Sequence, residues 1–253
     1  MIVQRLTKKN YWETVWSGVR LPSIARPCSD IHRIFEANLP KSLELTFLEI
    51  GCAPAAWMAY FHKNFGYAVT GIEYAQNAAQ IARKNLQIQE VQGNIVTADF
   101  FELGNCSPYD IVFSAGFVEH FEELYFVVGK ICSLSRQYVI TLVPNIYGIH
   151  GWVSKTFRPD VYHAHKKIDP FLLRELHEGS NMKTLFCEYV GGIQFTYPAA
   201  KNVFFEKRKK LSWIINFPFK GLNLGFRILN RLFGFSPRTR CLSPSVLYIG
   251  QKV

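Results

Sequence analysis

Short β-rich runs alternate with helical stretches between Thr46 and Val143, and this alternation constrains the fold more than any other feature of the chain. The runs expected to form strands are residues 46–51, 67–73, 93–98, 109–114 and 137–143. The stretches expected to form helices between them are residues 55–64, 75–86 and 119–134. Such alternation is typical of a parallel sheet covered by helices on both faces. The sequence therefore predicts an α/β fold.

The alternation stops after Pro144. Residues 144–169 are rich in glycine, histidine and tyrosine, and we expect them to form a long loop over an active face. A helix is expected at 170–178, because Pro170 suits the first helical position. Two further strands are expected at 183–190 and 245–252.

These elements suggest a division of the chain. Residues 1–45 are expected to form a helical lead-in or lid, in which Tyr11, Trp12 and Trp16 either cover a ligand or pack on the sheet. Residues 46–253 are expected to form one domain, interrupted by a basic amphipathic insertion at 199–240.

Charge is distributed unevenly along the chain. The net charge is +10, and all of it belongs to residues 201–253, which contain 11 Lys and Arg and a single acidic residue, Glu206. A neutral body with a basic surface element argues against a general nucleic-acid binder. The six cysteines are widely separated, and the first twenty residues lack the apolar core of a signal peptide. A reducing, cytoplasmic setting without a disulfide scaffold is therefore expected.

The stretch Glu49-Ile-Gly-Cys-Ala-Pro-Ala55 joins the first expected strand to the first expected helix. Gly51 permits a sharp turn, and the small side chains of Ala53 and Ala55 let a ligand approach the backbone. The helix that follows favours a negative group at its N-terminus. A dinucleotide fingerprint needs three glycines in this turn, so binding of a pyrophosphate is not favoured.

Two acidic residues mark the ends of the next two strands. Glu73 follows Gly51 by 22 residues, where a carboxylate can accept hydrogen bonds from both ribose hydroxyls. Asp99 and Phe100 end the third strand, placing a carboxylate and an aromatic ring where an adenine would lie. The fourth strand then runs into Ser114-Ala-Gly-Phe-Val-Glu-His-Phe121.

In this order and spacing, the motifs resemble those of the class I S-adenosylmethionine-dependent methyltransferases. The similarity is greatest to a bacterial group with an LEIGC-x-P-G first motif, a G-I-E/D-Y second motif and an S-x-G-x-x-EHF fourth motif. It covers residues 46–145 closely, and extends more loosely to the N-terminal tryptophans and to the strand at 243–250. The resemblance implies a Rossmann-like seven-stranded sheet and S-adenosylmethionine as cofactor.

The resemblance also implies a cofactor site made by the first-motif loop, the acidic strand ends and the fourth strand: Glu49, Gly51, Cys52, Ala53, Ala55, Glu73, Tyr74, Asp99, Phe100, Ser114, Ala115 and Gly116. Within it, Glu73 would bind the ribose, and Asp99 with Phe100 would hold the adenine. Ala53 and Ala55 replace glycines of the usual E-x-G-x-G-x-G motif, and because alanine disfavours a positive φ, we expect this change to weaken cofactor binding without abolishing it. Because the carboxylates of Glu73 and Asp99 are both present, a cofactor site that still binds is favoured over one that has lost binding.

Methyl transfer needs a base only when the acceptor must lose a proton. His120, at the expected start of the helix after the fourth strand, is the candidate base, although it could simply pack near the cofactor. Glu119 and His120 are also similar to residues of metal-assisted quinone O-methyltransferases. No third ligand is evident, so no metal site is expected. His150, His163 and His165 could bind substrate or metal, or be solvated loop residues.

Residues 207–235 combine the basic run Lys207-Arg-Lys-Lys210 with a segment rich in Trp, Phe, Leu and Ile. Polar residues at 212, 216, 220, 223, 227 and 230/231 form one stripe at helical spacing, and Pro218 is expected to split the segment into two helices. Basic residues within it argue against a membrane-spanning helix and favour docking on an anionic membrane surface. The alternatives are a lid over the substrate pocket and a dimer face.

These features predict transfer of a methyl group from S-adenosylmethionine to an oxygen of a small or lipid-linked acceptor. A surface-polysaccharide precursor or a quinone-like lipid would suit both the resemblance and the tail. The protein is expected in the cytoplasm, peripheral on the inner face of the cell membrane. The alternative is a nucleic-acid-binding protein on a degenerate methyltransferase fold, which the neutral body disfavours.

Overall fold

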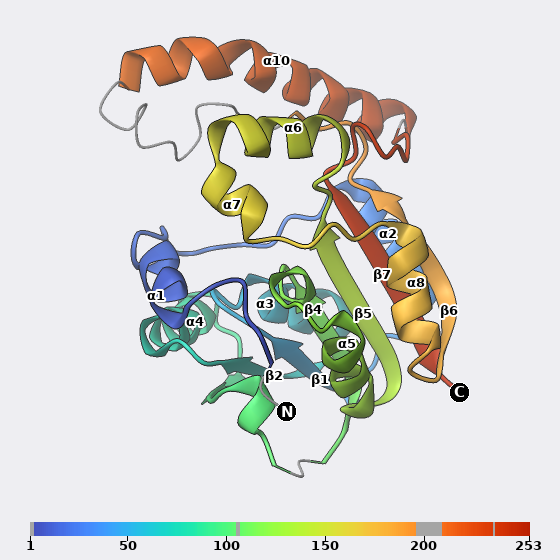
Figure 1. Cartoon of the computed structure of the whole chain (residues 1–253). Coiled ribbons are helices and arrows are strands. Elements are labelled where there is room, and N and C mark those ends of the chain that lie inside the picture. Colours follow the sequence, from blue (N-terminus) through green and yellow to red (C-terminus); the bar gives the residue numbers. More distant parts are fainter. Residues whose placement is uncertain (1–2, 105–106, 196–208, 235) are drawn as a thin grey trace.

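A seven-stranded sheet with the order β3-β2-β1-β4-β5-β7-β6 forms the centre of the molecule in the computed structural model, which describes residues 3–104, 107–195, 209–234 and 236–253 (Figure 1). Its strands are β1 (Thr46–Ile50), β2 (Ala68–Glu73), β3 (Gly93–Thr97), β4 (Tyr109–Ala115), β5 (Ser135–Pro144), β6 (Met182–Val190) and β7 (Ser245–Lys252). The first five pair in parallel, whereas β7 lies antiparallel between β5 and β6. This arrangement confirms the predicted α/β, Rossmann-like seven-stranded fold.

The parallel register sets the position of the site. Ile50 at the end of β1 pairs with Ile72 of β2 and with Ser114 of β4. The carboxyl ends of these three strands therefore meet at one edge of the sheet, where ligands bind in open α/β sheets. β1 and β4 are largely buried along their length, as expected for central parallel strands covered on both faces.

Helices cover the two faces of the sheet with separate apolar clusters. On one face, α2 (Ser29–Asn38), α3 (Ala56–Phe65) and α4 (Gln76–Ile88) contribute to a cluster with β1, β2 and β4. On the other, α5 (Leu124–Ser133) and α8 (Pro170–Glu178) pack against β4, β5 and β7. The predicted start of α8 is confirmed, because Asp169 caps the helix by accepting from the Leu172 amide at 2.9 Å.

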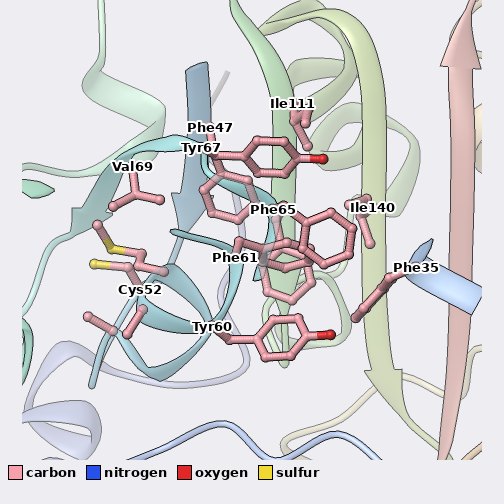
Figure 2. Close-up of a cluster of buried hydrophobic side chains, with 14 of the residues drawn as sticks. Phe35, Phe47, Cys52, Tyr60, Phe61, Phe65, Tyr67, Val69, Ile111 and Ile140 are labelled. Atoms are coloured by element: carbon pink, nitrogen blue, oxygen red, sulfur yellow. The ribbon is translucent and has the colours of Figure 1, made fainter. Parts of the chain in front are cut away.

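Aromatic side chains dominate the first of these clusters (Figure 2). The Phe47 ring lies 4.8 Å from that of Phe61 and 5.9 Å from that of Phe113, measured between centroids. Tyr67 stacks on Phe61, and its hydroxyl donates to the Pro40 carbonyl. Much of the high aromatic content thus serves the core beneath β1 and α3.

The predicted N-terminal lead-in contains two helices, α1 (Lys9–Ser17) and α2. α1 packs beside α4. The Glu13 carboxylate accepts hydrogen bonds from the amides of Gln76 and Asn77, both at 2.9 Å, and so caps the N-terminus of α4. The lead-in is therefore joined to the helix that follows β2.

The prediction of a long loop at 144–169 is wrong, because this segment contains α6 (Gly148–Phe157) and α7 (Pro159–His163). Its glycines allow the backbone of α6 to lie close to neighbouring segments. A Cβ at Gly151 would lie 1.8 Å from the Ile146 carbonyl oxygen. His150 is buried on α6, with Nε2 3.0 Å from the Leu242 carbonyl oxygen, so it is not a solvated loop residue.

Two expected helix boundaries also differ. The helix predicted from residue 119 begins at Leu124, and His120 lies instead in a separate 3₁₀ turn, η2 (Val118–His120). A similar turn, η1 (Phe100–Glu102), follows β3. The basic segment forms one helix, α10 (Lys209–Phe233), rather than two. Pro218 lies inside this helix and is exposed, and a helix can continue through a proline where the carbonyl that loses its donor is satisfied by water.

α10 runs across the top of the molecule in Figure 1. Residues 199–208 and 235 of the predicted insertion and tail lie outside the described residues. Within the part of the chain that is described, no helix is both long and apolar enough to cross a bilayer.

Candidate active site

A cavity of about 1050 Å³ opens at the carboxyl edge of the sheet. The ends of β1, β2 and β4 form its floor, the lead-in forms one side, and α10 contributes its roof. Ligand pockets usually measure roughly 300–1,000 Å³, so this cavity has room for a cofactor and a second small molecule.

The loop after β1 bends back through two left-handed positions. Gly51 has φ +68°, and a Cβ there would lie 3.0 Å from Cδ2 of Phe117. Ala55 has φ 64° at the start of α3, a conformation that favours glycine. Ala55 therefore holds a backbone conformation in which glycine is the usual residue, at the cost of local strain.

Glu73 is fixed at the end of β2 by the backbone of both neighbouring loops. Its Oε1 accepts from the Ala75 amide at 2.9 Å, and its Oε2 accepts from the Ala53 amide at 3.4 Å. The side chain is 5% exposed and faces the cavity, and burial raises its pKa. A carboxylate held in this way retains acceptor capacity for the hydroxyls of a ribose.

Glu49 occupies a comparable position at the end of β1. Its Oε2 accepts from the Met58 amide in the first turn of α3 at 3.0 Å. Burial raises the pKa of this carboxyl well above its usual value, and the neighbouring Glu73 acts in the same direction. Together these acids make the cofactor end of the cavity rich in hydrogen-bond acceptors.

Asp99 is engaged by a residue far away in the sequence. Arg5 Nη2 lies 2.5 Å from Oδ1 and 2.6 Å from Oδ2 of Asp99. Burial alone would raise the pKa of Asp99, but the hydrogen bonds from Arg5 and the Phe101 amide outweigh it, so this pKa is lowered. Arg5 also stacks over the Tyr74 ring, 4.8 Å from its centroid. The N-terminal segment thus closes the adenine end of the predicted site.

His120 lies at the cavity wall, with Trp12 and His165 as its nearest ring neighbours. Its Nδ1 is 2.7 Å from the Ala164 carbonyl oxygen, and its ring centroid is 5.0 Å from that of Trp12 and 4.5 Å from that of His165. Burial, and then the neighbouring His165, lowers the pKa of His120 to about 4. Its imidazole is therefore neutral at pH 7 and a weak proton acceptor, so its role as a general base stays a prediction.

Glu119 is the most deeply buried acid of this group. It is 1% exposed, and burial raises its pKa to about 8. Neither of its carboxyl oxygens has a hydrogen-bond partner among the described residues. Its Oε1 lies 3.8 Å from Nε2 of His120.

The roof presents the polar stripe of α10 to the cavity, where Asn223, Phe226, Arg227, Asn230 and Arg231 line it. The side chain of Asn223 pairs with the backbone of Phe195, accepting from its amide at 2.7 Å and donating to its carbonyl at 2.9 Å. The arginines give the roof the opposite charge to the acidic strand ends on the floor.

The opposite side of α10 carries large apolar side chains into solvent: Phe217, Leu222, Leu224, Ile228, Leu229, Leu232 and Phe233. Leu232 is 68% exposed and Phe233 is 75% exposed. The helix is thus turned with its polar stripe inward and its apolar face outward. We call these seven residues the outer face of α10.

The structure gathers most of the predicted site residues around the cavity: Glu49, Gly51, Ala53, Glu73, Tyr74, Asp99, Phe100, Ala115, Gly116 and His120. Three others, Cys52, Ala55 and Ser114, are buried behind its wall and do not line it. Cys52 packs its sulfur against Gly71 in the sheet. These three shape the loop and strand end rather than offering side chains to a ligand.

Sequence reasoning missed Arg5 and Arg26 as residues of the cavity, whereas the position of α10 over it matches the lid that the sequence offered as an alternative to membrane docking. Nothing local to Arg5 indicates its pairing with Asp99. For the inward orientation of the polar side of α10, the sequence does contain a signal. Asn216, Asn223 and Asn230 recur every seven residues, and asparagine is a poor helix former that gains little on an exposed face.

Comparison with known proteins agrees with this geometry. Residues 47–136 match the family model of a methyltransferase domain. Residues 47–136 therefore belong to a methyltransferase domain, and the fold of the chain is that of the class I S-adenosylmethionine-dependent methyltransferases. The methyltransferase matches no curated protein sequence at a significant level.

Solved structures share the fold of this methyltransferase at low identity. Geranyl diphosphate C-methyltransferase from Streptomyces coelicolor A3(2) is 9% identical with a TM-score of 0.59, and the match covers 97% of this chain and 98% of that one. Magnesium protoporphyrin IX methyltransferase from Synechocystis PCC 6803, solved with S-adenosylhomocysteine, is 11% identical with a TM-score of 0.55, covering 97% and 83%. A possible sarcosine dimethylglycine methyltransferase from Galdieria sulphuraria is 13% identical with a TM-score of 0.57, covering 88% and 82%.

These findings confirm the predicted enzyme class and its cofactor, S-adenosylmethionine. The residues present fit that cofactor, because Glu73 offers a fixed carboxylate in the cavity and Gly51, which has no side chain, lines the same cavity. The assignment of single residues to parts of the cofactor stays a prediction.

Proposed function

We propose that this methyltransferase transfers the methyl group of S-adenosylmethionine to an oxygen of a small or lipid-linked acceptor at the inner face of the cell membrane. The observation that supports the proposal best is the orientation of α10. One side of this helix lines the cavity with Arg227 and Arg231, and the other side carries the outer face into solvent. A single helix can therefore contact an acceptor and a membrane together.

The charges in the cavity favour an acceptor that carries negative charge. The cofactor end is lined by Glu49, Glu73 and Asp99, whereas the roof is lined by Arg227 and Arg231. No carboxylate within salt-bridge distance of either arginine occurs among the described residues. A phosphate-bearing surface-polysaccharide precursor would suit this roof, and a quinone-like lipid would suit its apolar walls. Similar structures from other organisms act on small molecules, such as geranyl diphosphate.

The outer face supports membrane contact by the same helix. Isolated exposed apolar residues are common on proteins, but here seven of them share one side of one helix. Lys220, which does not line the cavity, is exposed on the same helix, and each basic residue near an anionic surface contributes about 1 kcal/mol of attraction. The predicted basic cluster at 207–210 begins outside the described residues.

Two measurements test this function. Incubation of the protein with S-adenosylmethionine carrying a labelled methyl group and a total cell extract should place label in the lipid or glycolipid fraction, with an O-methyl product detected by mass spectrometry. Flotation with anionic vesicles should recover the wild-type protein, and neutral vesicles should recover much less. Replacing Leu232 and Phe233 by Ser should reduce recovery, whereas Phe171→Ser, which removes a 77% exposed side chain from α8, should not.

The proposal would be overturned by two results. Label that appears in nucleic acid or protein and is absent from small-molecule and lipid fractions would refute the acceptor class. Equal recovery of the wild-type protein with anionic vesicles and with no vesicles would refute the membrane contact and favour a lid or a dimer face.

A further inference from the structure

We infer that Glu119, His120 and His165 form a binding site for a divalent transition-metal ion of the zinc type, beside the cofactor cavity. Each residue can offer one ligand atom, and these atoms all lie within 4.8 Å of one another. The site combines adjacent residues of η2 with one residue from the segment after α7. The third ligand is His165, one of three histidines that the sequence offered for substrate or metal but could not place beside Glu119 and His120.

The backbone holds the two segments together. The Lys166 amide donates to the Glu119 carbonyl oxygen at 2.7 Å, and His120 Nδ1 lies 2.7 Å from the Ala164 carbonyl oxygen. These contacts lie on either side of His165 in the sequence. The segment that leaves α7 is therefore fixed against η2, and His165 is positioned by hydrogen bonds rather than by chance proximity.

Both imidazoles are oriented as metal ligands usually are. His120 Nδ1 faces the Ala164 carbonyl, and His165 Nδ1 faces the Val161 carbonyl at 2.5 Å. A carbonyl can only accept, so each Nδ1 carries the proton and each Nε2 keeps its lone pair. A second hydrogen bond of this kind fixes the tautomer and orientation of most metal-bound histidines. Two Nε2 atoms thus remain available at one place.

Glu119 supplies the observation that calls for a cation. Its side chain is 1% exposed, and neither oxygen has a hydrogen-bond partner among the described residues. A buried carboxylate without a partner is costly, and such groups are normally paired with a cation or bound to a metal. One of these oxygens lies 3.8 Å from His120 Nε2, a separation that modest closure around an ion would shorten.

The donor set selects the class of ion. Two imidazole nitrogens and one carboxylate suit zinc and neighbouring transition metals better than Mg²⁺ or Ca²⁺, which prefer all-oxygen ligands. Three protein ligands leave a coordination position open. His120 lines the cavity, and an added Cβ at Gly116 would lie 3.6 Å from Glu119 Oε1, so the ion would sit at the cavity wall.

This inference rests on the geometry of the three residues and does not depend on which acceptor is used. If zinc binds, Nε2 of His120 is a ligand and no longer a general base. The metal and the base are thus alternative roles for His120, and a metal titration decides between them. A failed titration would leave the proposed methyl transfer intact.

The test is a zinc titration of untagged, chelator-treated full-length protein, measured by calorimetry and by metal content after gel filtration. We expect one equivalent of Zn²⁺ per chain and a higher melting temperature with zinc. His165→Ala should weaken zinc affinity at least about 100-fold, since removing a ligand should exceed the loss seen for supporting residues. The matched control His163→Ala removes an exposed histidine two residues away and should bind zinc as wild type does.

Glu119→Gln gives a second, independent readout. It should lose zinc binding while the metal-free protein melts at the same or a higher temperature, because an unpartnered buried acid becomes a neutral amide. Wild-type protein that retains no zinc above the buffer background would overturn the inference. So would His165→Ala and Glu119→Gln proteins that are folded and bind zinc with unchanged affinity.

Discussion

Replacement of Glu73 by Ala tests the cofactor site most directly. The Glu73 carboxylate is anchored by the amides of Ala53 and Ala75 and faces the cavity at the end of β2. A hydrogen bond to a charged group contributes about 1.5–3 kcal/mol, and about 1.4 kcal/mol corresponds to a tenfold change in affinity. Loss of the ribose contact should therefore raise the dissociation constant of S-adenosylmethionine roughly 10- to 150-fold.

Isothermal titration calorimetry measures this change, and circular dichroism with thermal melting verifies the fold. Glu73→Gln keeps an oxygen that can accept from the nearer amide, Ala75, and should preserve the melting temperature better than Glu73→Ala. Glu102→Ala is the matched control, since it removes an exposed carboxylate close to the site without touching the cavity. A folded Glu73→Ala protein with wild-type affinity would refute the assignment of the ribose site.

Three further changes test the loop and the N-terminal segment. Gly51→Ala places a methyl group 3.0 Å from Phe117 in a left-handed conformation, and should destabilise the fold by about 1–3 kcal/mol in chemical denaturation; an unchanged midpoint would contradict the strained turn. Glycine at position 53 or 55 should keep or improve affinity for S-adenosylmethionine in calorimetry, because Ala55 already holds φ 64° and Ala53 borders the cavity; no binding by these variants and the wild type would mean an inactive loop. Arg5→Ala should cost about 1–2 kcal/mol of unfolding free energy at pH 7, discounted for the partial exposure of the pair. Arg5 holds the pKa of Asp99 in the folded protein below its unfolded value of about 3.9. The stabilisation by the Arg5–Asp99 pair is therefore complete above a pH of about 3.9 and should disappear as the pH falls through the folded pKa. A stability difference between wild type and Arg5→Ala that persists below the folded pKa would refute this account.

Local patterns in the sequence sufficed for the sheet and for the acidic strand ends. β1, β2 and β4 are short apolar runs bounded by turns, and the spacing from Gly51 to Glu73 follows from one strand–helix–strand unit. The same patterns could not reveal contacts between distant segments. Arg5 meets Asp99 across 94 residues. His165 joins Glu119 and His120 only because α7 and the segment after it return to η2.

The errors have a physical basis as well. The glycines of the 144–169 segment favour a loop by sequence, whereas in the structure Gly148 and Gly151 permit α6 to pack closely against its neighbours. Pro218 was expected to end a helix, but its effect depends on whether the freed carbonyl can reach water. In the segment 207–235 the polar stripe could be recognised from the sequence. Which side of the helix faces the body could not be read from it, because both a membrane and a cavity can accept such a stripe.

The hydrogen bonds between Asn223 and Phe195 determine how α10 is turned about its own axis. Burial of apolar side chains normally decides how a surface helix is turned, yet here that side is directed outward. A rotation by one residue, about 100°, would bring Leu222 or Leu224 toward the cavity and swing Arg227 away from it. The two hydrogen bonds of one amide oppose that rotation, since a leucine cannot satisfy the Phe195 amide and carbonyl. Asn223 thus fixes the rotational orientation of α10, and with it which side chains of the helix face a molecule bound in the cavity.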